Sequence, residues 1–289
     1  MIKTILVPAN GTETDAASYV AALPILRGFG AHLDALHVRV DPVEVAVAMT
    51  TEGAGGTLLD GIIEGLTREA DDAEAKARAM FEEFCRRESL LNAAEPGANG
   101  SPSAQFNVKT GQQTRWMTAL GTTADLAVAA RGSSDDPSAG RATLEALLLE
   151  TGRPLLIPGI VAPAGGEFTQ RVSIAWKPTP QAARAVAYAM PLLLRAKDVA
   201  VLTVDEEESG PGAAQRLVRY LGWHGVNATA TRLTADAKGG AAALLGAART
   251  RGGLLVMGGY GHTRLREWVF GGFTASVLDH ADIPVLMAH

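Results

Sequence analysis

Short apolar runs alternate with longer helical stretches along this chain, and the same order of elements occurs twice. In the first half, residues 5–8 and 32–38 are apolar runs separated by a helical stretch. In the second half, residues 172–176 and 199–204 repeat that arrangement. Short apolar runs separated by helices are typical of parallel strands that are buried on both faces. The pattern therefore predicts α/β structure in both halves.

The C-terminal part of each half repeats as well. The run at residues 124–129 matches residues 253–257, and the run at residues 153–158 matches residues 283–287. The offset between matching runs drifts, which indicates an insertion in the first half. Each half then has five strands alternating with helices, so we expect two tandem doubly wound, Rossmann-like parallel sheets with right-handed crossovers.

Proline and glycine cluster where the helical and strand periodicity lapses, after residue 160. Such clusters are typical of exposed linkers between domains. We predict a first domain at residues 1–160, a linker at residues 161–170 and a second domain at residues 171–289.

Two segments depart from the simple repeat. Residues 58–66 carry apolar side chains at helical spacing, so we expect them to lengthen a helix that continues through the charged run to Glu88. Packing against its own domain is the favoured interpretation of this helix, and the alternative is a helix that covers a ligand or a partner. The segment from Asn92 to Ser103 is rich in glycine, proline, alanine and serine, which predicts an exposed loop.

Composition narrows the class of protein. The chain has 289 residues, of which 47% are hydrophobic, and this is enough for two domains with buried cores. The net charge of −5 argues against a general nucleic-acid surface but leaves room for one phosphate pocket. The single cysteine, Cys85, is expected to be a buried free thiol on a helix. With no signal-peptide pattern or membrane-length apolar run, we expect a cytoplasmic protein without a membrane partner.

The most informative motif follows the apolar run that ends at Met257. Gly258 and Gly261 would allow the chain to turn sharply and approach other groups closely. Gly271 and Gly272 would then leave backbone N–H groups uncovered where a helix is predicted to begin, an arrangement that attracts anions. The glycine spacing differs from that of the phosphate-binding P-loop and from that of the dinucleotide fingerprint.

This segment resembles the ATP-binding signature of the universal stress protein family, Gly-x2-Gly-x9-Gly-Ser/Thr, between the fourth strand and the fourth helix. The repeat resembles the tandem form of that family over essentially the whole chain. The resemblance implies a cytoplasmic α/β fold and binding of ATP or another adenine nucleotide, often with a divalent ion such as Mg²⁺. It also implies that the two halves pair through their C-terminal strands, and it leaves further homo-oligomerisation open.

The same resemblance implies a nucleotide site in the second half, in which strand ends surround the adenine and ribose and the glycine loop holds the phosphates. Its residues are Ala175, Lys177, Val204, Met257, Gly258, Gly261, Gly271, Gly272 and Thr274. Two of these positions depart from the family pattern. Gly272 replaces a Ser or Thr, and Lys177 replaces an Asp that would accept hydrogen bonds from the adenosine, although a lysine can reach a phosphate.

The corresponding loop of the first half is degenerate. Only Gly132 and Gly140 fit the glycine pattern, and Asp135 and Asp136 place negative charge where a phosphate would bind. Asn10 stands where the Asp of the first strand is expected and could contact a base or a ribose. We therefore expect the first half to be mainly structural.

Three functions remain open from the sequence. The favoured one is a nucleotide-binding regulatory module, for which the resemblance suggests a role in stress response. The second is a slow ATPase or nucleotidyl-transfer enzyme, which is less favoured because no general base or nucleophile accompanies the loop. The third is a dimerisation or chaperone-like module without a nucleotide. The spacing of the six histidines predicts no metal site and no catalytic residue.

Overall fold

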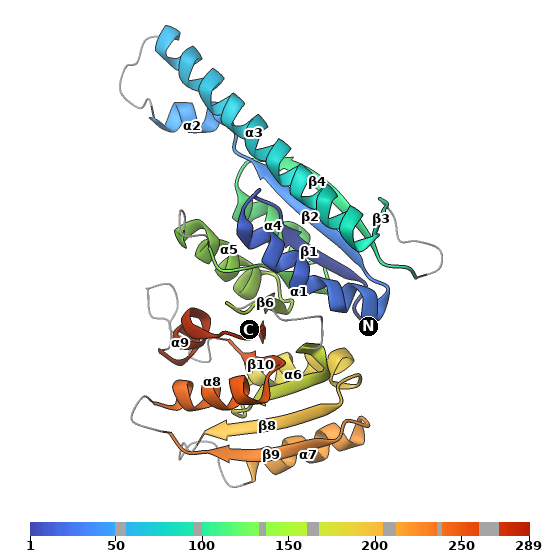
Figure 1. The fold of residues 1–289 in the computed structure, drawn as a ribbon. Coiled ribbons are helices and arrows are strands. Elements are labelled where there is room, and N and C mark those ends of the chain that lie inside the picture. Colours follow the sequence, from blue (N-terminus) through green and yellow to red (C-terminus); the bar gives the residue numbers. More distant parts are fainter. Residues whose placement is uncertain are drawn as a thin grey trace.

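The protein folds as two similar halves that follow one another along the chain (Figure 1). The computed structural model describes residues 1–49, 56–94, 100–132, 137–160, 168–204, 212–235, 239–259 and 272–289. The predicted linker at residues 161–170 lies mostly outside this part of the chain, so the domain boundary stays a prediction.

The first half contains one insertion between its second and third main strands. Its elements are β1 (Thr4–Pro8), α1 (Glu13–Phe29), β2 (His32–Arg39), α2 (Pro42–Met49), α3 (Gly56–Glu88), β3 (Leu91–Asn92), β4 (Ser103–Thr110), α4 (Gln113–Gly121), β5 (Leu126–Val128), α5 (Pro137–Glu150) and β6 (Leu155–Ile157).

The second half alternates strand and helix throughout. Its elements are β7 (Arg171–Ala175), α6 (Pro180–Leu193), β8 (Asp198–Val204), α7 (Ala213–Trp223), β9 (Ala228–Leu233), α8 (Gly240–Arg251), β10 (Leu254–Gly258), α9 (Gly272–His280) and β11 (Val285–Ala288).

The strands in the described residues form one 11-stranded sheet with the order β3-β4-β2-β1-β5-β6-β11-β10-β7-β8-β9. Among the described strand pairs, β6–β11 is antiparallel, with Leu156 opposite Leu286, and the others are parallel. Each half thus has the strand order of a doubly wound sheet, and the predicted α/β fold class is confirmed.

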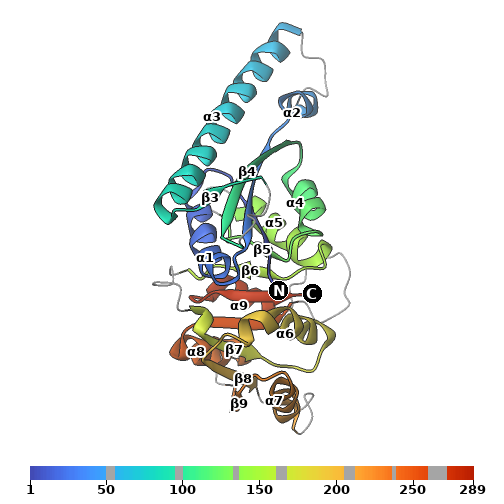
Figure 2. The ribbon, with the colours of Figure 1, turned by 90° about the vertical axis from the view of Figure 1, so that its right-hand side faces the viewer.

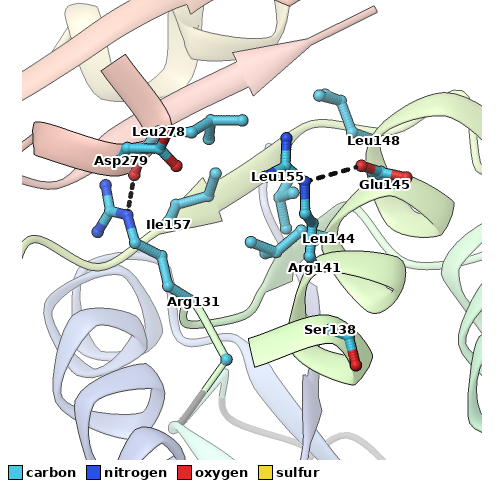
Figure 3. Close-up of a pocket in the computed structure, with 11 residues that line it drawn as sticks. Arg131, Ser138, Arg141, Leu144, Glu145, Leu148, Leu155, Ile157, Leu278 and Asp279 are labelled. Carbon is cyan, nitrogen blue, oxygen red and sulfur yellow. Dashed lines mark hydrogen bonds and ion pairs between the residues drawn. The ribbon is translucent and has the colours of Figure 1, made fainter. Parts of the chain in front are cut away.

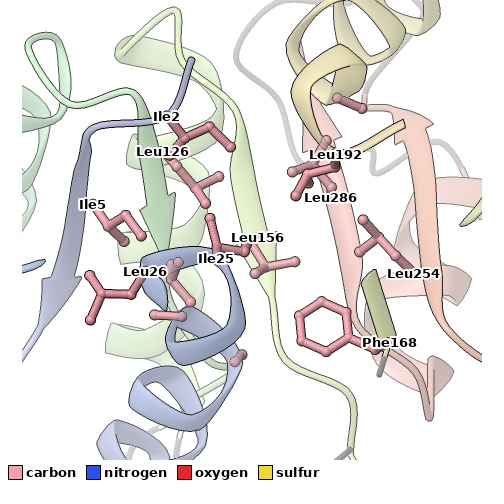
Figure 4. Packing of buried hydrophobic residues seen from close by; sticks show 14 of the residues in the cluster. Ile2, Ile5, Ile25, Leu26, Leu126, Leu156, Phe168, Leu192, Leu254 and Leu286 are labelled. Atoms are coloured by element: carbon pink, nitrogen blue, oxygen red, sulfur yellow. The ribbon is translucent and has the colours of Figure 1, made fainter. Parts of the chain in front are cut away.

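Alternating side chains of the strands contribute to two layers of core, one on each face of the sheet. One layer holds residues of α1, α3, α6 and α7, and the other holds residues of α4, α5, α8 and α9. Both layers continue from one half into the other. Figure 4 shows this for the first layer, where Leu156 of β6 lies between Ile25 of α1 on one side and Leu286 and Phe168 on the other. The strand pair at the junction is therefore covered by apolar side chains on both faces.

The predicted long helix is confirmed as α3, which runs for 33 residues to Glu88. Its C-terminal part packs on its own domain, because Phe81 and Phe84 both contact the ring of Tyr19. Its N-terminal part extends past the sheet and is accompanied by α2 (Figures 1 and 2). Residues 58–66, for which packing against the parent domain was the favoured interpretation, lie in the part of α3 that extends past the sheet beside α2.

The prediction of an exposed loop from Asn92 to Ser103 is wrong at both ends. Asn92 belongs to the short strand β3, which pairs with β4 at the edge of the sheet. Ser103 is buried at the start of β4, and its hydroxyl lies 2.8 Å from Nδ1 of His32. Polar composition alone missed these contacts because a serine that is satisfied by a buried partner can occupy a strand.

Cys85 is buried on α3 as a free thiol, as predicted. Burial, followed by the nearby charge of Glu82, raises the pKa of this thiol to about 11. At pH 8 the thiolate fraction should therefore be about a hundredfold lower than in the unfolded chain. Alkylation by iodoacetamide at pH 8 should be correspondingly slow in native protein and fast in urea. Equal rates in the two conditions would show that the thiol is accessible and unperturbed.

None of the helices in the described residues is both long enough and apolar enough to cross a membrane.

Candidate functional site

The carboxyl ends of three neighbouring strands meet at one edge of the second-half sheet. Met257 of β10 pairs with Ala175 of β7, and β8, which ends at Val204, lies on the other side of β7. The chain leaves β7 through α6 toward β8, whereas it leaves β10 through α9 toward β11. The connections diverge between β7 and β10, and such a switch point is where doubly wound sheets form a ligand crevice.

Gly258 lets the end of β10 lie directly against the start of α6. A Cβ atom at this position would lie 2.5 Å from the backbone nitrogen of Ala182 and 2.8 Å from the carbonyl carbon of Gln181. Helix α6 begins there because Thr179 caps it, with its hydroxyl accepting a hydrogen bond from the Ala182 N–H at 3.2 Å. The close approach thus places a capped helix N-terminus beside the ends of β7 and β10.

Helix α9 begins at Gly272, close to the predicted start of the helix, and Thr274 in its first turn is buried. Gly261 and Gly271 lie outside the described residues, as does His262. The structure therefore brings together Ala175, Val204, Met257 and Gly258 at the switch point, and it places Gly272 and Thr274 at the N-terminus of the following helix. The loop between these two groups stays a prediction from the sequence.

The chain just after β7 carries polar groups that sequence analysis only partly identified. Lys177 is half-buried there, and the backbone N–H of Trp176 extends the sheet by donating to the carbonyl of Leu202 at 2.8 Å. The indole Nε1 of Trp176 and Oε1 of Gln181 are both buried without a hydrogen-bond partner. The sequence did not indicate Gln181 as a site residue. Its position in the first turn of a helix that follows a strand end was the one feature that could have done so. The indole rests on the core, while its unpartnered N–H leaves a donor near the site.

In the first half, the loop after β1 is filled by a side chain of the protein itself. Oδ2 of the buried Asp15 accepts hydrogen bonds from the backbone N–H groups of Asn10 at 2.7 Å, Gly11 at 2.7 Å and Thr12 at 3.3 Å. Burial raises the pKa of the Asp15 carboxyl, and the three hydrogen bonds oppose that rise. The N–H of Asn10, a residue that the sequence suggested as a base or ribose contact, is thus already occupied.

Gly132 and Gly140, the two glycines that fit the degenerate pattern of the first half, lie directly against each other. A Cβ atom on Gly140 would lie 2.1 Å from Cα of Gly132, so the start of α5 packs directly on the end of the β5 loop. Ala130 stands two residues after Val128, the position that Gly258 holds after Val256 in β10, and its N–H donates to Oγ of Ser18 at 3.0 Å. Asp135 and Asp136 lie outside the described residues.

Two of the histidines that the structure describes lie within hydrogen-bond distance of backbone carbonyl oxygens. His37 Nδ1 lies 2.7 Å from the carbonyl oxygen of Ala9, and His280 Nδ1 lies 2.9 Å from that of Ser276. In the described parts of the chain, no group of three or more His, Cys, Asp or Glu residues could hold a metal ion.

Comparisons with known proteins agree on the fold. No protein-family model matches the sequence, and no curated protein matches it either. A universal stress protein from Archaeoglobus fulgidus matches the structure with a TM-score of 0.68 and 14% identity, over 99% of this chain and 97% of that one. A putative universal stress protein from Pseudomonas aeruginosa matches with a TM-score of 0.57 and 14% identity, over 99% and 93%. A functionally unknown protein from the same species matches with a TM-score of 0.55 and 15% identity, over 99% and 92%. The whole chain therefore has the fold of the universal stress proteins.

Proposed function

We propose that the second half of this protein binds an adenine nucleotide, with ATP as the first candidate, and that the protein acts as a nucleotide-binding regulatory module in stress response. The observation that carries the proposal is the switch point between β7 and β10. Three strand ends meet there, and the capped N-terminus of α6 lies against them across Gly258. The stress-response role is suggested by the universal stress proteins that share the fold.

The residues at the strand ends suit the two parts of such a ligand. Ala175 and Val204 offer partly exposed apolar surface to a base, and Met257 is buried in the core at the end of β10. Gly272 at the start of α9 has a backbone N–H that the helix leaves unpaired, and unpaired N–H groups at helix N-termini bind phosphate. Lys177 after β7 supplies a positive charge at the same edge.

A divalent ion such as Mg²⁺ would be held mainly by phosphate oxygens and water, because Mg²⁺ commonly binds with few protein ligands. Its contribution would be to neutralise phosphate charge. The sequence places no evident general base or nucleophile beside the expected phosphate position, so we propose that the protein residues hold the nucleotide without reacting with it.

Mass spectrometry of the ligand released on denaturing freshly purified protein tests the proposal first, and calorimetry with ATP, ADP and AMP, with and without Mg²⁺, tests it quantitatively. An adenine nucleotide in the released fraction, or saturable binding of one, is the expected result. A protein that is empty and binds none of the three would refute the proposal and favour the dimerisation module. ATP turnover well above background would instead favour the enzyme.

Thr274→Val should weaken ATP binding by about five- to tenfold, because the loss of one hydroxyl donor to a phosphate costs about 1 kcal/mol. The matched control is Thr143→Val in α5 of the first half, where the hydroxyl donates to the carbonyl of Ala139. Both threonines are buried and the substitution keeps their shape. Calorimetry gives the dissociation constant for ATP of each variant. Equal constants for the two variants would show that Thr274 does not contact the nucleotide.

A further inference from the structure

A cavity of about 350 Å³ lies between the two halves, on the side of the sheet that carries α5 and α9 (Figure 3). Its apolar wall is made by Leu144 and Leu148 of α5, Leu155 and Ile157 of β6, and Leu278 of α9. The cavity thus has walls from both halves, beside the antiparallel pair β6–β11. It is separate from the switch point, which lies at the carboxyl ends of β7, β8 and β10.

The size and lining of this cavity suit a small molecule. Pockets for small ligands start at roughly 300 Å³ and are lined mainly by apolar side chains. The pocket is partly open to solvent, so water can enter it, but aliphatic walls hold water poorly, and an apolar group that displaces poorly held water gains binding free energy. Five aliphatic side chains therefore favour an apolar occupant over water.

Most polar atoms of the charged side chains in the described wall have partners, although Nη2 of Arg131 is buried without a hydrogen-bond partner. Arg131 donates through Nη1 to the carbonyl of Pro158 at 2.8 Å and through Nε to that of Leu278. Burial lowers the pKa of Arg131, and the charge of Asp279, which also lines the cavity, opposes this. At the other end, Arg141 pairs with Glu145 at 3.3 Å.

Among the described lining residues, these four side chains carry two positive and two negative charges, so the described part of the wall presents no net charge to a ligand. An ion that entered would lose hydration without a compensating partner, which is costly. The wall therefore discriminates against ions. We propose that this cavity is a binding site for a small, uncharged apolar molecule that bridges the two halves of the protein.

An occupant would act on α9, the helix that begins at the candidate nucleotide site. Leu278 stands one turn after Thr274 on that helix. On the opposite wall, Leu148 lies 3.0 Å from the position of a Cβ atom on Gly259, the residue that follows β10. An occupant in contact with both leucines would tie α5 to α9 and restrict the motion of α9. Only the link from α9 to nucleotide rests on the proposed function, whereas the binding itself does not.

The test uses the full chain with 1-octanol and octanoate, which share an apolar chain and differ in charge. Calorimetry should show that octanol binds with one-to-one stoichiometry and that octanoate binds at least about tenfold more weakly. Hydrogen exchange with octanol should show protection in α5 and α9. No binding of octanol, tighter binding of octanoate, or protection confined to other helices would each overturn the proposal.

Leu144→Phe fills the cavity and should lower octanol affinity by about tenfold or more, with circular dichroism as the check on folding. The matched control is Leu149→Phe on the same helix, because Leu149 is 44% exposed and lies outside the cavity. Should Leu144→Phe fail to fold, Leu278→Phe on α9 fills the same space from the other half. A folded cavity variant that binds octanol like wild type would show that the ligand lies elsewhere. These measurements need no nucleotide, so they can succeed even where nucleotide binding fails.

Discussion

Replacement of Gly258 by alanine is expected to cost about 1–3 kcal/mol of stability and to weaken nucleotide binding by at least about tenfold. The added Cβ would lie 2.5 Å from the backbone nitrogen of Ala182, which no real Cβ contact tolerates, and the obstacle is backbone that cannot rotate away. Either β10 or the start of α6 must move. Because both border the switch point, the geometry of the candidate site changes with them.

Urea unfolding and ATP calorimetry on the same variant separate these two effects. Gly246→Ala provides the matched substitution, because a Cβ at that position in α8 would meet no atom within 4 Å. The Gly246→Ala substitution should stabilise the protein by up to about 1 kcal/mol, because alanine has a higher helix propensity than glycine. A Gly258→Ala variant with wild-type stability would show that the strand and the helix separate easily. A destabilised variant with wild-type ATP affinity would place the nucleotide elsewhere.

Asp15→Ala should destabilise the first half by about 3 kcal/mol. Three backbone N–H groups, those of Asn10, Gly11 and Thr12, lose their shared acceptor, and each unsatisfied buried donor costs about 1–3 kcal/mol, with water able to reach part of this loop. This loss of stability is large for one turn because a single carboxylate oxygen accepts all three hydrogen bonds.

Asp15→Asn provides the informative comparison, since the amide oxygen can still accept and the loss should be roughly half as large. Glu13→Ala, an exposed change in the same helical turn, should cost less than about 1 kcal/mol. Chemical unfolding monitored by circular dichroism ranks the three variants. Equal losses for Asp15→Ala and Glu13→Ala would show that the loop finds other acceptors and that Asp15 does not hold it.

The sequence was sufficient for those features that depend on local pattern. Apolar runs at strand spacing located β7, β8 and β10, and the helical spacing of residues 58–66 predicted α3 as a helix that continues to Glu88. The glycine cluster after Met257 indicated the place of α9. These features were predictable because neighbours along the chain determine helix periodicity, strand burial and the conformations open to glycine.

Other features depend on residues far apart in the chain. Ser103 lies in a strand, where its hydroxyl is within hydrogen-bond distance of His32. The backbone of Gln181 lies beside the end of β10 because Gly258 has no side chain to separate α6 from the strand. The first half showed a degenerate loop in its sequence, but the contact of Gly140 with Gly132 and the place of Ala130 against Ser18 needed the folded chain.

By itself, therefore, the sequence determined the duplicated α/β architecture and the helical insertion, because both rest on local periodicity, whereas the residues of the candidate site came from the resemblance to the universal stress proteins. Only the tertiary structure decided that Asp15 fills the loop after β1 and that α5, β6 and α9 border a pocket whose described charges balance. The cavity walls come from residues more than a hundred positions apart, such as Leu144 and Leu278. Packing between such distant segments depends on how the two halves meet, and no local pattern in the chain encodes it.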